Sequence, residues 1–400
     1  MEGLPFALVN TVALILFKNL GFDNAEITLF TSLFTIPWFI KPLLAPIIET
    51  SITKHKLILL ISSGFGFLVL LLAASLNWNY FFIASIGIFF ALAFISSLFD
   101  MTVDGLYIAQ LNRTQQAHFI GIRTVSYHIG RLIAQGGIVL LASLLFTRFG
   151  IKLSWQIAFI CLALFVLLIA LYHSWVLPVD QSPSFQSNSY LYHFKAVLAE
   201  LHALPYFKHV VIFVLLYNFS ENQLIKIIPL FLMDSTAHGG LEFSTAYIGM
   251  LIGTIGTISM LMGILFSGLL LAKISLSRYL LPVTILSGIT NFGYLFISFY
   301  GIQSIYFITI IIIMTQFTFG LSNGAYMLYL LNSFSKGTYY MSLYAIGTAL
   351  MGFSAMFGGA ISGYLQSLFG YNEFFSWIIV CNATIIVYCY YLIKKGYCHA

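Results

Sequence analysis

Charged side chains inside apolar stretches are the groups of this sequence best placed to do chemistry. Asp100 and Asp104 lie four residues apart in "FDMTVDGLY", so they share one face of a helix. Lys41 in "FTIPWFIKPLLAPIIE" and Arg123 in "GIRTVSYHIGRL" fall at a matching level when depth is counted at about 1.5 Å per residue. Two acids and two cations at one level predict ion pairs, which act either as a permanent clamp or as a gate. Alternatively, Asp100 or Asp104 carries a proton.

Arg131 and Glu221 lie deeper, each roughly 18 Å into an apolar span, and Gln316 is at a similar depth. Arg131 is suited to anchor a carboxylate or a phosphate, because its guanidinium can bond both oxygens at once. Glu221 is a candidate for carrying a proton, because burial disfavours the charged form of a carboxyl group. The alternative is an Arg131–Glu221 salt bridge that holds the two halves of the chain together.

A polar helix face surrounds Glu221 in the stretch "YNFSENQLIK". Asn218, Asn222 and Lys226 recur there at four-residue steps and must line water or pair within a bundle of helices. Aromatic residues on the polar helices are able to stack on a sugar or a ring, although packing is their commoner role; they are Trp38, Tyr107, Tyr127, Tyr326 and Tyr329. The ligand-binding residues expected from these patterns are Arg131, Asn218, Asn222, Gln316, Tyr127 and Tyr326.

The elements that must position these residues are membrane helices. The chain is 60% hydrophobic and only 7% charged, and its mean hydropathy is +0.98. Apolar runs of about 20 residues, each able to cross a ~30 Å hydrocarbon core, recur along the whole chain. They predict an all-α membrane protein with about twelve spans, of which the first is either short or begins upstream of this sequence: 2–18, 25–48, 57–77, 79–109, 119–146, 154–176, 209–232, 244–271, 279–299, 303–332, 339–366 and 373–393.

Lysine and arginine are concentrated in the even-numbered loops and the tail, which predicts that both termini are cytoplasmic. The net charge of +5 follows from this topology and does not indicate nucleic-acid binding. The four cysteines flank no loop as a pair, so no disulfide is expected, and the nine histidines lack metal-ligand spacing. We therefore expect no metal and no cofactor.

Weak internal repeats suggest two six-helix bundles that arose by duplication. Gly136 and Gly358 are offset by 222 residues, as are Ser154 and Ser376, and Gly150 and Gly370 are offset by 220. Such repeats are common in secondary transporters. The expected domains are an N-terminal bundle at 1–176, a cytoplasmic linker with an interfacial helix at 177–208, and a C-terminal bundle at 209–400.

Four stretches carry a resemblance to a known family: "EGLPFALV", "PWFIKPLLAPIIE", "DMTVDGLYIAQL" with "GIRTVSYHIGRL", and "NQLIKIIPLFLMD". The chain resembles the AmpG-like permeases of the major facilitator superfamily, in the peptide/acetyl-coenzyme-A transporter branch, and in particular the members common in Bacteroidetes. The resemblance implies a secondary transporter that imports muropeptides, cell-wall fragments, with protons across the bacterial inner membrane. It also places Glu49, a further candidate gate residue, at the acid that precedes the basic second loop.

The sequence departs from the family pattern at two places. His128 stands where the family usually has an arginine, and the basic loop 49–56 is thin. These departures affect the expected substrate, so a ferric siderophore is the alternative to an anhydro-muropeptide. The competing function class is a membrane-embedded transferase. Against it, the expected loops are short, and no His/Asp or nucleophile group of residues is expected at one depth. We expect a monomer in the lipid bilayer, with a small-molecule substrate and protons as partners.

Overall fold

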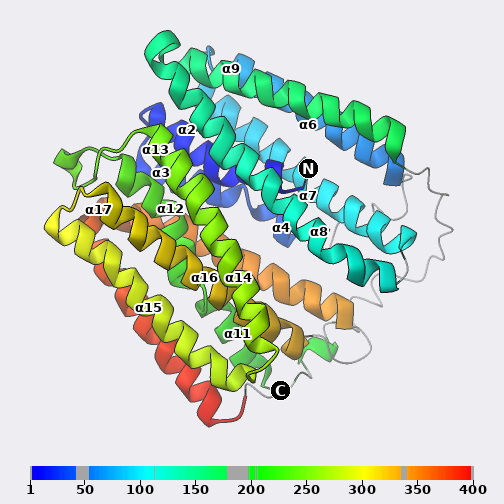
Figure 1. Ribbon diagram of the computed structural model, residues 1–400, viewed down its shortest axis with the longest axis vertical. Coiled ribbons are helices and arrows are strands. Elements are labelled where there is room, and N and C mark those ends of the chain that lie inside the picture. The colour runs from blue at the N-terminus through cyan, green and yellow to red at the C-terminus, as the bar shows by residue number, and fades with distance from the viewer. Residues whose placement is uncertain are drawn as a thin grey trace. The chain divides into compact units, whose positions relative to one another are not determined.

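The computed structural model describes residues 2–41, 54–111, 113–177, 197, 199–202, 204, 206–334 and 340–397. These residues form helices and turns, with no strand among them (Figure 1). In chain order the elements are α1 (Gly3–Ala7), the π-helix η1 (Leu8–Val12), α2 (Ala13–Asn19), α3 (Asn24–Leu33), α4 (Ile36–Phe39), α6 (Lys54–Ser75), α7 (Phe81–Gln110), α8 (Arg113–Leu132), the π-helix η2 (Ile133–Ile138), α9 (Val139–Val176), α11 (Phe207–Leu216), α12 (Phe219–Met233), the 3₁₀-helix η3 (Thr236–His238), α13 (Thr245–Ile248), the π-helix η4 (Gly249–Gly256), α14 (Thr257–Leu271), α15 (Leu276–Tyr300), α16 (Ile305–Phe334) and α17 (Tyr340–Lys394).

Eight helical stretches of the described chain are long and apolar enough to cross a membrane. Two of them, Val125–Val176 and Ser342–Lys394, are 52 and 53 residues long, and each is broken by one glycine. Gly150 has φ 75° and ψ 168°, and Gly370 has φ 81° and ψ 177°, a backbone region that is open essentially to glycine alone. The break therefore recurs at the 220-residue offset seen in the sequence.

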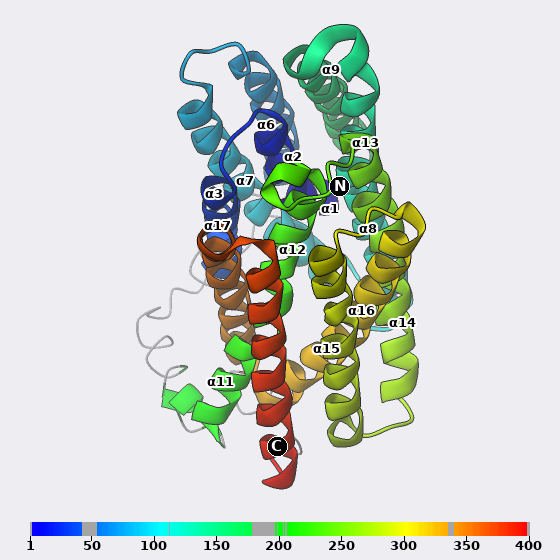
Figure 2. The same ribbon diagram turned by 90° about the vertical axis from the view of Figure 1, so that its left-hand side faces the viewer.

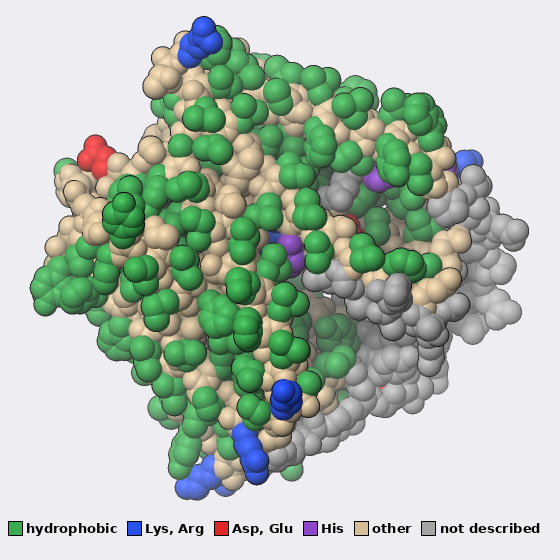
Figure 3. All heavy atoms as spheres, viewed as in Figure 1, with side chains coloured by type: hydrophobic (Ala, Val, Ile, Leu, Met, Phe, Trp, Pro, Cys, Tyr) green, Lys and Arg blue, Asp and Glu red, His purple; other side chains and the backbone are tan. Residues whose placement is uncertain are grey.

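The expected all-helical membrane architecture is confirmed. The first expected span corresponds to the shorter apolar helix Gly3–Asn19. The second is described to residue 41 and consists of α3 and α4 in place of one continuous helix. Apolar side chains cover most of the face seen in Figure 3, and lysine and arginine side chains lie mainly at its edge. This distribution suits a protein that is surrounded by lipid.

The chain divides into two compact units. Unit 1 comprises Met1–Phe22, Leu33–Gln186 and Ser244–Gly253, and unit 2 comprises Asp23–Ser32, Ser187–Phe243 and Thr254–Ala400. The N-terminal segment that contains α3 thus belongs by its contacts to unit 2. The division into domains at 1–176, 177–208 and 209–400 stays a prediction.

In unit 1, α6 packs between α7 and α9, and α1 packs on α8. The contact of α1 with α8 needs glycine, because a Cβ on Gly3 would lie 1.9 Å from the carbonyl oxygen of Tyr127. This close approach brings the first residues of the chain against the polar stretch of α8. Both lie at the site described below.

In unit 2, α12 packs on α17, and α14, α15 and α17 surround α16 (Figure 2). The core contains large side chains from α11, α15 and α16, among them Phe213, Tyr279 and Phe334. This packing fixes the rotation of α12 about its own axis. Its polar residues therefore face α15 on one side and α3 and α17 on another.

Candidate functional site

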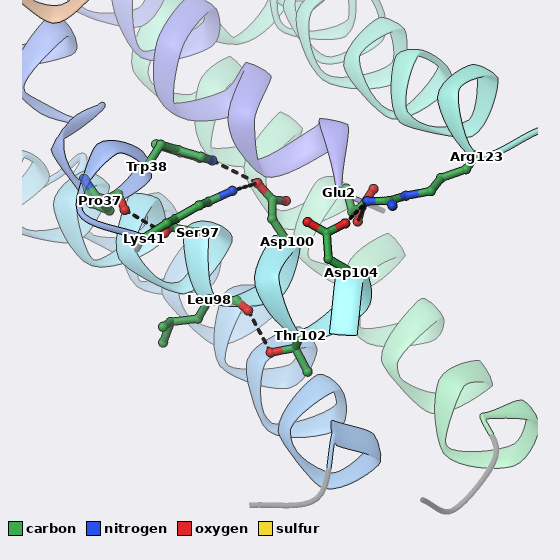
Figure 4. A network of polar contacts seen from close by, with 10 residues as sticks. All are labelled: Glu2, Pro37, Trp38, Lys41, Ser97, Leu98, Asp100, Thr102, Asp104 and Arg123. Carbon is green, nitrogen blue, oxygen red and sulfur yellow. Dashed lines mark hydrogen bonds and ion pairs between the residues drawn. The ribbon is translucent and has the colours of Figure 1, made fainter. Parts of the chain in front are cut away.

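A network of acids and cations occupies unit 1 where α1, α4, α7 and α8 meet (Figure 4). The ammonium of Lys41 lies 2.9 Å from Oδ2 of Asp100, and the indole Nε1 of Trp38 donates to the same oxygen at 2.9 Å. The predicted pairing of Lys41 with an acid on the fourth span is present, and the partner is Asp100. Both side chains are largely buried, with 25% and 16% of their surfaces exposed.

The proline-containing segment before Lys41 positions this pair. Pro37 lies in the first turn of α4, where a missing N–H costs nothing. Its carbonyl oxygen accepts a 2.8 Å hydrogen bond from the hydroxyl of Ser97 on α7. A neighbouring helix thus serves a backbone group of the interrupted span, as expected for a polar group at membrane depth. Pro42 and Pro46 lie outside the described residues.

The second cation, Arg123, bridges two acids. One guanidinium nitrogen contacts Oδ1 of Asp104 closely and donates to Oε1 of Glu2 at 3.1 Å. The guanidinium carbon also lies 5.2 Å from the ring centroid of Tyr107, within cation–π range. Arg123 therefore ties α8 to α7 and to the start of α1.

Glu2 is a site residue that the sequence reasoning missed. Its signal was available, because a carboxylate stands directly before the apolar run in "EGLPFALV". Glu2 stands at the start of the first apolar run, where counting helix rise does not place it at the level of Arg123. The close contact of Gly3 with α8 is what brings Glu2 to Arg123.

Arg131 lies at the end of α8 and has no ion-pair partner among the described residues. Its guanidinium carbon lies 5.7 Å from the ring centroid of Phe6, and its Nε is buried without a hydrogen-bond acceptor. Tyr127 and His128 are near neighbours in the chain, with ring centroids 5.2 Å apart, and Nδ1 of His128 is also buried and unpartnered. Arg131 thus has a buried donor without an acceptor, and His128 has a buried ring nitrogen without a partner, among the described residues.

Glu221 is buried in unit 2 and faces α15. Its Oε1 accepts hydrogen bonds from the Ser287 hydroxyl at 2.8 Å and from the Asn291 amide at 2.7 Å. No cation of the described residues forms an ion pair with it. Its described contacts are therefore neutral donors.

The other predicted residues of α12 and α16 differ in their surroundings. Oδ1 of Asn218, the residue before α12, is buried without a donor, whereas Asn222 and Gln316 are partly exposed. Lys226 is buried, and its ammonium donates to the backbone oxygen and to the hydroxyl oxygen of Thr31. The polar face predicted for this helix is thus directed into the protein.

Comparison with known proteins shows which family the chain belongs to. The Major Facilitator Superfamily matches residues 1–355. The chain belongs to this superfamily. It is 26% identical over 356 residues to the putative transporter AmpG 1 of Rickettsia bellii, covering 86% of this chain and 84% of that protein. The anhydromuropeptide permease of Escherichia coli K12 is 22% identical over 187 residues, which cover 44% of this chain and 37% of that protein. The predicted resemblance to AmpG-like permeases is confirmed.

Solved structures agree on the fold of this superfamily member. A POT family transporter in complex with 5-aminolevulinic acid matches with a TM-score of 0.75 at 10% identity, covering 98% of this chain and 94% of that one. The likeness is one of fold. The superfamily match and the apolar helices show that the chain is a multi-pass membrane transporter.

Two of the aromatic residues expected at a ligand lie in the core of unit 2. Tyr326 is 0% exposed, and its hydroxyl donates to the carbonyl oxygen of Val214 at 2.6 Å. Tyr329 is 1% exposed and its ring centroid lies 4.0 Å from that of Phe213. In this structure both rings pack against other side chains, and a role for them in binding a ligand stays a prediction.

A polar cluster of unit 2 was not anticipated. The amide of Asn24 on α3 donates to Oδ2 of Asp234 at 2.8 Å and to Oε1 of Gln366 at 2.9 Å, and the hydroxyl of Tyr371 also contacts Asp234. Its residues come from three distant parts of the sequence, so no local pattern indicates it. Glu49, expected at a gate, lies outside the described residues, and no group of metal-ligating side chains occurs in the described part of the chain.

Proposed function

We propose that the protein is a proton-coupled importer of anhydro-muropeptides that works by alternating access. The superfamily match and the AmpG-type relatives support transport of a small molecule. The name of the Escherichia coli relative supports the choice of muropeptide. In this proposal the substrate is imported across the bacterial inner membrane. Both termini lie in the cytoplasm, which is the orientation that the distribution of lysine and arginine indicates.

The observation that carries the coupling proposal is the environment of Glu221. A buried carboxyl group that is held by a cation is locked in its charged form, whereas neutral donors accommodate either form. Ser287 and Asn291 both donate to Oε1, which leaves Oε2 as the atom that gains or loses a proton. Glu221 is thus the proposed proton carrier. Asp100, which has Lys41, and Asp104, which has Arg123, are second choices.

The substrate anchor in this proposal is Arg131. A buried guanidinium nitrogen without an acceptor is costly unless something completes it. The peptide stem of a muropeptide carries carboxylates, which suit the planar fork of arginine. Tyr127 and the polar groups Asn218, Asn222 and Gln316 are proposed to bond or stack on the rest of the substrate.

The network of Lys41, Asp100, Arg123, Asp104 and Glu2 is proposed as a gate on the cytoplasmic side. Asp100 and Asp104 both lie on α7, and their partners come from other segments of the chain, so that moving those segments away from α7 breaks the Lys41–Asp100 and Arg123–Asp104 pairs. Asp104 is 48% exposed, which is consistent with a pair that water reaches. We propose that the working protein is a monomer.

Two assays test the proposal with purified protein. Uptake into proteoliposomes should concentrate an anhydro-muropeptide only when the outside is more acidic. Ligand binding to the native state raises the melting temperature as ligand concentration exceeds the dissociation constant, so anhydro-muropeptide should stabilise the protein and a ferric siderophore should not. The reverse pattern would assign the protein to siderophore uptake, and stabilisation by neither would remove both substrates.

A further inference from the structure

Lys226 is a cation of unit 2 with neutral partners only. Its side chain is 6% exposed, and its ammonium donates to the carbonyl oxygen of Thr31 at 3.1 Å and to the Thr31 hydroxyl oxygen at 3.2 Å. No carboxylate of the described residues lies within ion-pairing distance of it. An ammonium has three donors, and the described residues supply acceptors for two of them.

Glu221 does not serve as its counter-charge along α12. The two residues are five apart, which places them well away from each other around the helix. The contacts agree, because Glu221 faces Ser287 and Asn291 on α15 whereas Lys226 faces Thr31 on α3. The positive charge of Lys226 is therefore uncompensated by its own helix.

The stem of Lys226 fits into a notch made by glycine. A Cβ on Gly359 of α17 would lie 3.3 Å from Cγ and 3.4 Å from Cε of Lys226, and 2.4 Å from the hydroxyl of Ser32. A side chain at 359 would thus displace either the lysine or α3. The site is built from three helices, which lie together in Figures 1 and 2.

Thr31 holds the ammonium as an acceptor. The Thr31 hydroxyl donates its own proton to the carbonyl oxygen of Ile27 at 2.7 Å, so only its lone pairs face Lys226. Neighbouring polar residues on the same face of α3 also contact other segments of unit 2: Thr28 accepts from the backbone of Gly363, and Asn24 donates to Asp234. The lysine is thus tied to the contact between α3 and helices α12 and α17.

We infer that Lys226 is a second anion-binding group of the transport path, which takes a carboxylate of the substrate when α3 moves away. This inference rests on the proposed alternating-access function. Separation of α3 removes both acceptors of the ammonium, and a buried lysine without acceptors favours an anion in their place. The carboxylate and Thr31 therefore compete for one cation, and Lys226 is a specificity-determining residue for acidic substrates.

The test measures local charge without using any substrate. Asn222, one helical turn before Lys226, is changed to cysteine in a chain in which Cys161, Cys381, Cys389 and Cys398 are replaced by alanine. The rate constants of its modification by an anionic and by a cationic methanethiosulfonate are then compared. A unit charge about 6 Å away changes each rate about threefold even at the dielectric constant of water, so Lys226→Gln should lower the anionic-to-cationic ratio about tenfold.

Further variants complete the test. Lys226→Arg should keep the ratio, because the positive charge remains. Lys208→Gln removes an exposed lysine on α11 and should leave the ratio unchanged. Thr31→Val should raise the ratio, because the ammonium of Lys226 loses one acceptor. A ratio that Lys226→Gln leaves unchanged would overturn the anion site, and one that Thr31→Val fails to raise would overturn the competition. Protection of the cysteine by anhydro-muropeptide supports the proposed substrate; a ratio that depends on Lys226 without such protection keeps the anion site and removes the muropeptide.

Discussion

Lys41 and Asp100 form an ion pair that also includes the indole of Trp38, because both donors bind Oδ2 of Asp100 at 2.9 Å. Oδ1 of the same carboxylate is buried without a partner. The single oxygen therefore holds α4 to α7 through two different side chains. Loss of the cation would leave a largely buried carboxylate that keeps a hydrogen bond from the neutral indole but no positive charge beside it.

The first prediction concerns this pair. Lys41→Met should destabilise the protein by up to about 3 kcal/mol, because removing one member of a largely buried pair strands the other charge. Lys41→Met combined with Asp100→Asn should recover most of that loss, since no charge is then left behind. Thermal unfolding in detergent measures both variants.

The control for this experiment is Lys56→Met, which removes an exposed lysine and should shift the melting temperature little. Asp104→Asn in place of Asp100→Asn should fail to rescue Lys41→Met, because Asp104 is bound by Arg123. Equal rescue by both asparagines would show that the pairing is exchanged between the two acids.

A second prediction concerns the bridge made by Arg123. Arg123→Lys should behave nearly as poorly as Arg123→Gln in uptake, because an ammonium lacks the planar guanidinium group that lies over Tyr107 while one of its nitrogens binds both Glu2 and Asp104. Glu2→Gln should be milder, since Asp104 remains to pair with the arginine. Full activity of Arg123→Lys would indicate that charge alone is required.

The sequence was sufficient for the membrane architecture and for the Lys41 pair, because both depend on local patterns. Apolar runs give the spans, and helix rise places Lys41 and Asp100 at one level. Glu2 and the Asn24–Asp234 cluster were not predicted, because they depend on close helix contacts at Gly3 and on residues more than 200 positions apart. The ring of Tyr326 was expected at a ligand because burial cannot be deduced from residue type in so aromatic a chain.

A third prediction tests the helix break shared by the two halves. Gly150→Ala should lower stability by about 1–3 kcal/mol, because its φ and ψ lie in a region that side chains avoid. Gly268→Ala, in the helix α14 with open space around it, should stabilise by up to about 1 kcal/mol. Thermal unfolding of the two variants compares them directly, and stabilisation by both would contradict the strained geometry at Gly150.

A fourth prediction concerns Arg131. Arg131→Ala should weaken binding of an anhydro-muropeptide by at least about tenfold at every pH, because a charge-assisted pair contributes roughly 1.5–3 kcal/mol. Arg131→Lys should recover only part of the affinity, since it keeps the charge and loses the fork. Titration calorimetry provides the measurement, and Arg148→Ala at the end of the same bundle is the control. Unchanged affinity in Arg131→Ala would remove it as the anchor.

The last prediction separates proton coupling from transport. Glu221→Gln keeps an oxygen that accepts from Ser287 and Asn291, so the fold should be retained with a stability change within about 1 kcal/mol. The amide cannot release or bind the coupling proton, so uphill uptake driven by a pH gradient should be lost while exchange of internal for external substrate continues. Glu373→Gln, at an exposed carboxyl group, should keep both activities. If Glu221→Gln still concentrates substrate fully in proteoliposomes, the proton is carried elsewhere, and Asp100 and Asp104 become the groups to test, because a carboxyl group inside the bundle is then still required.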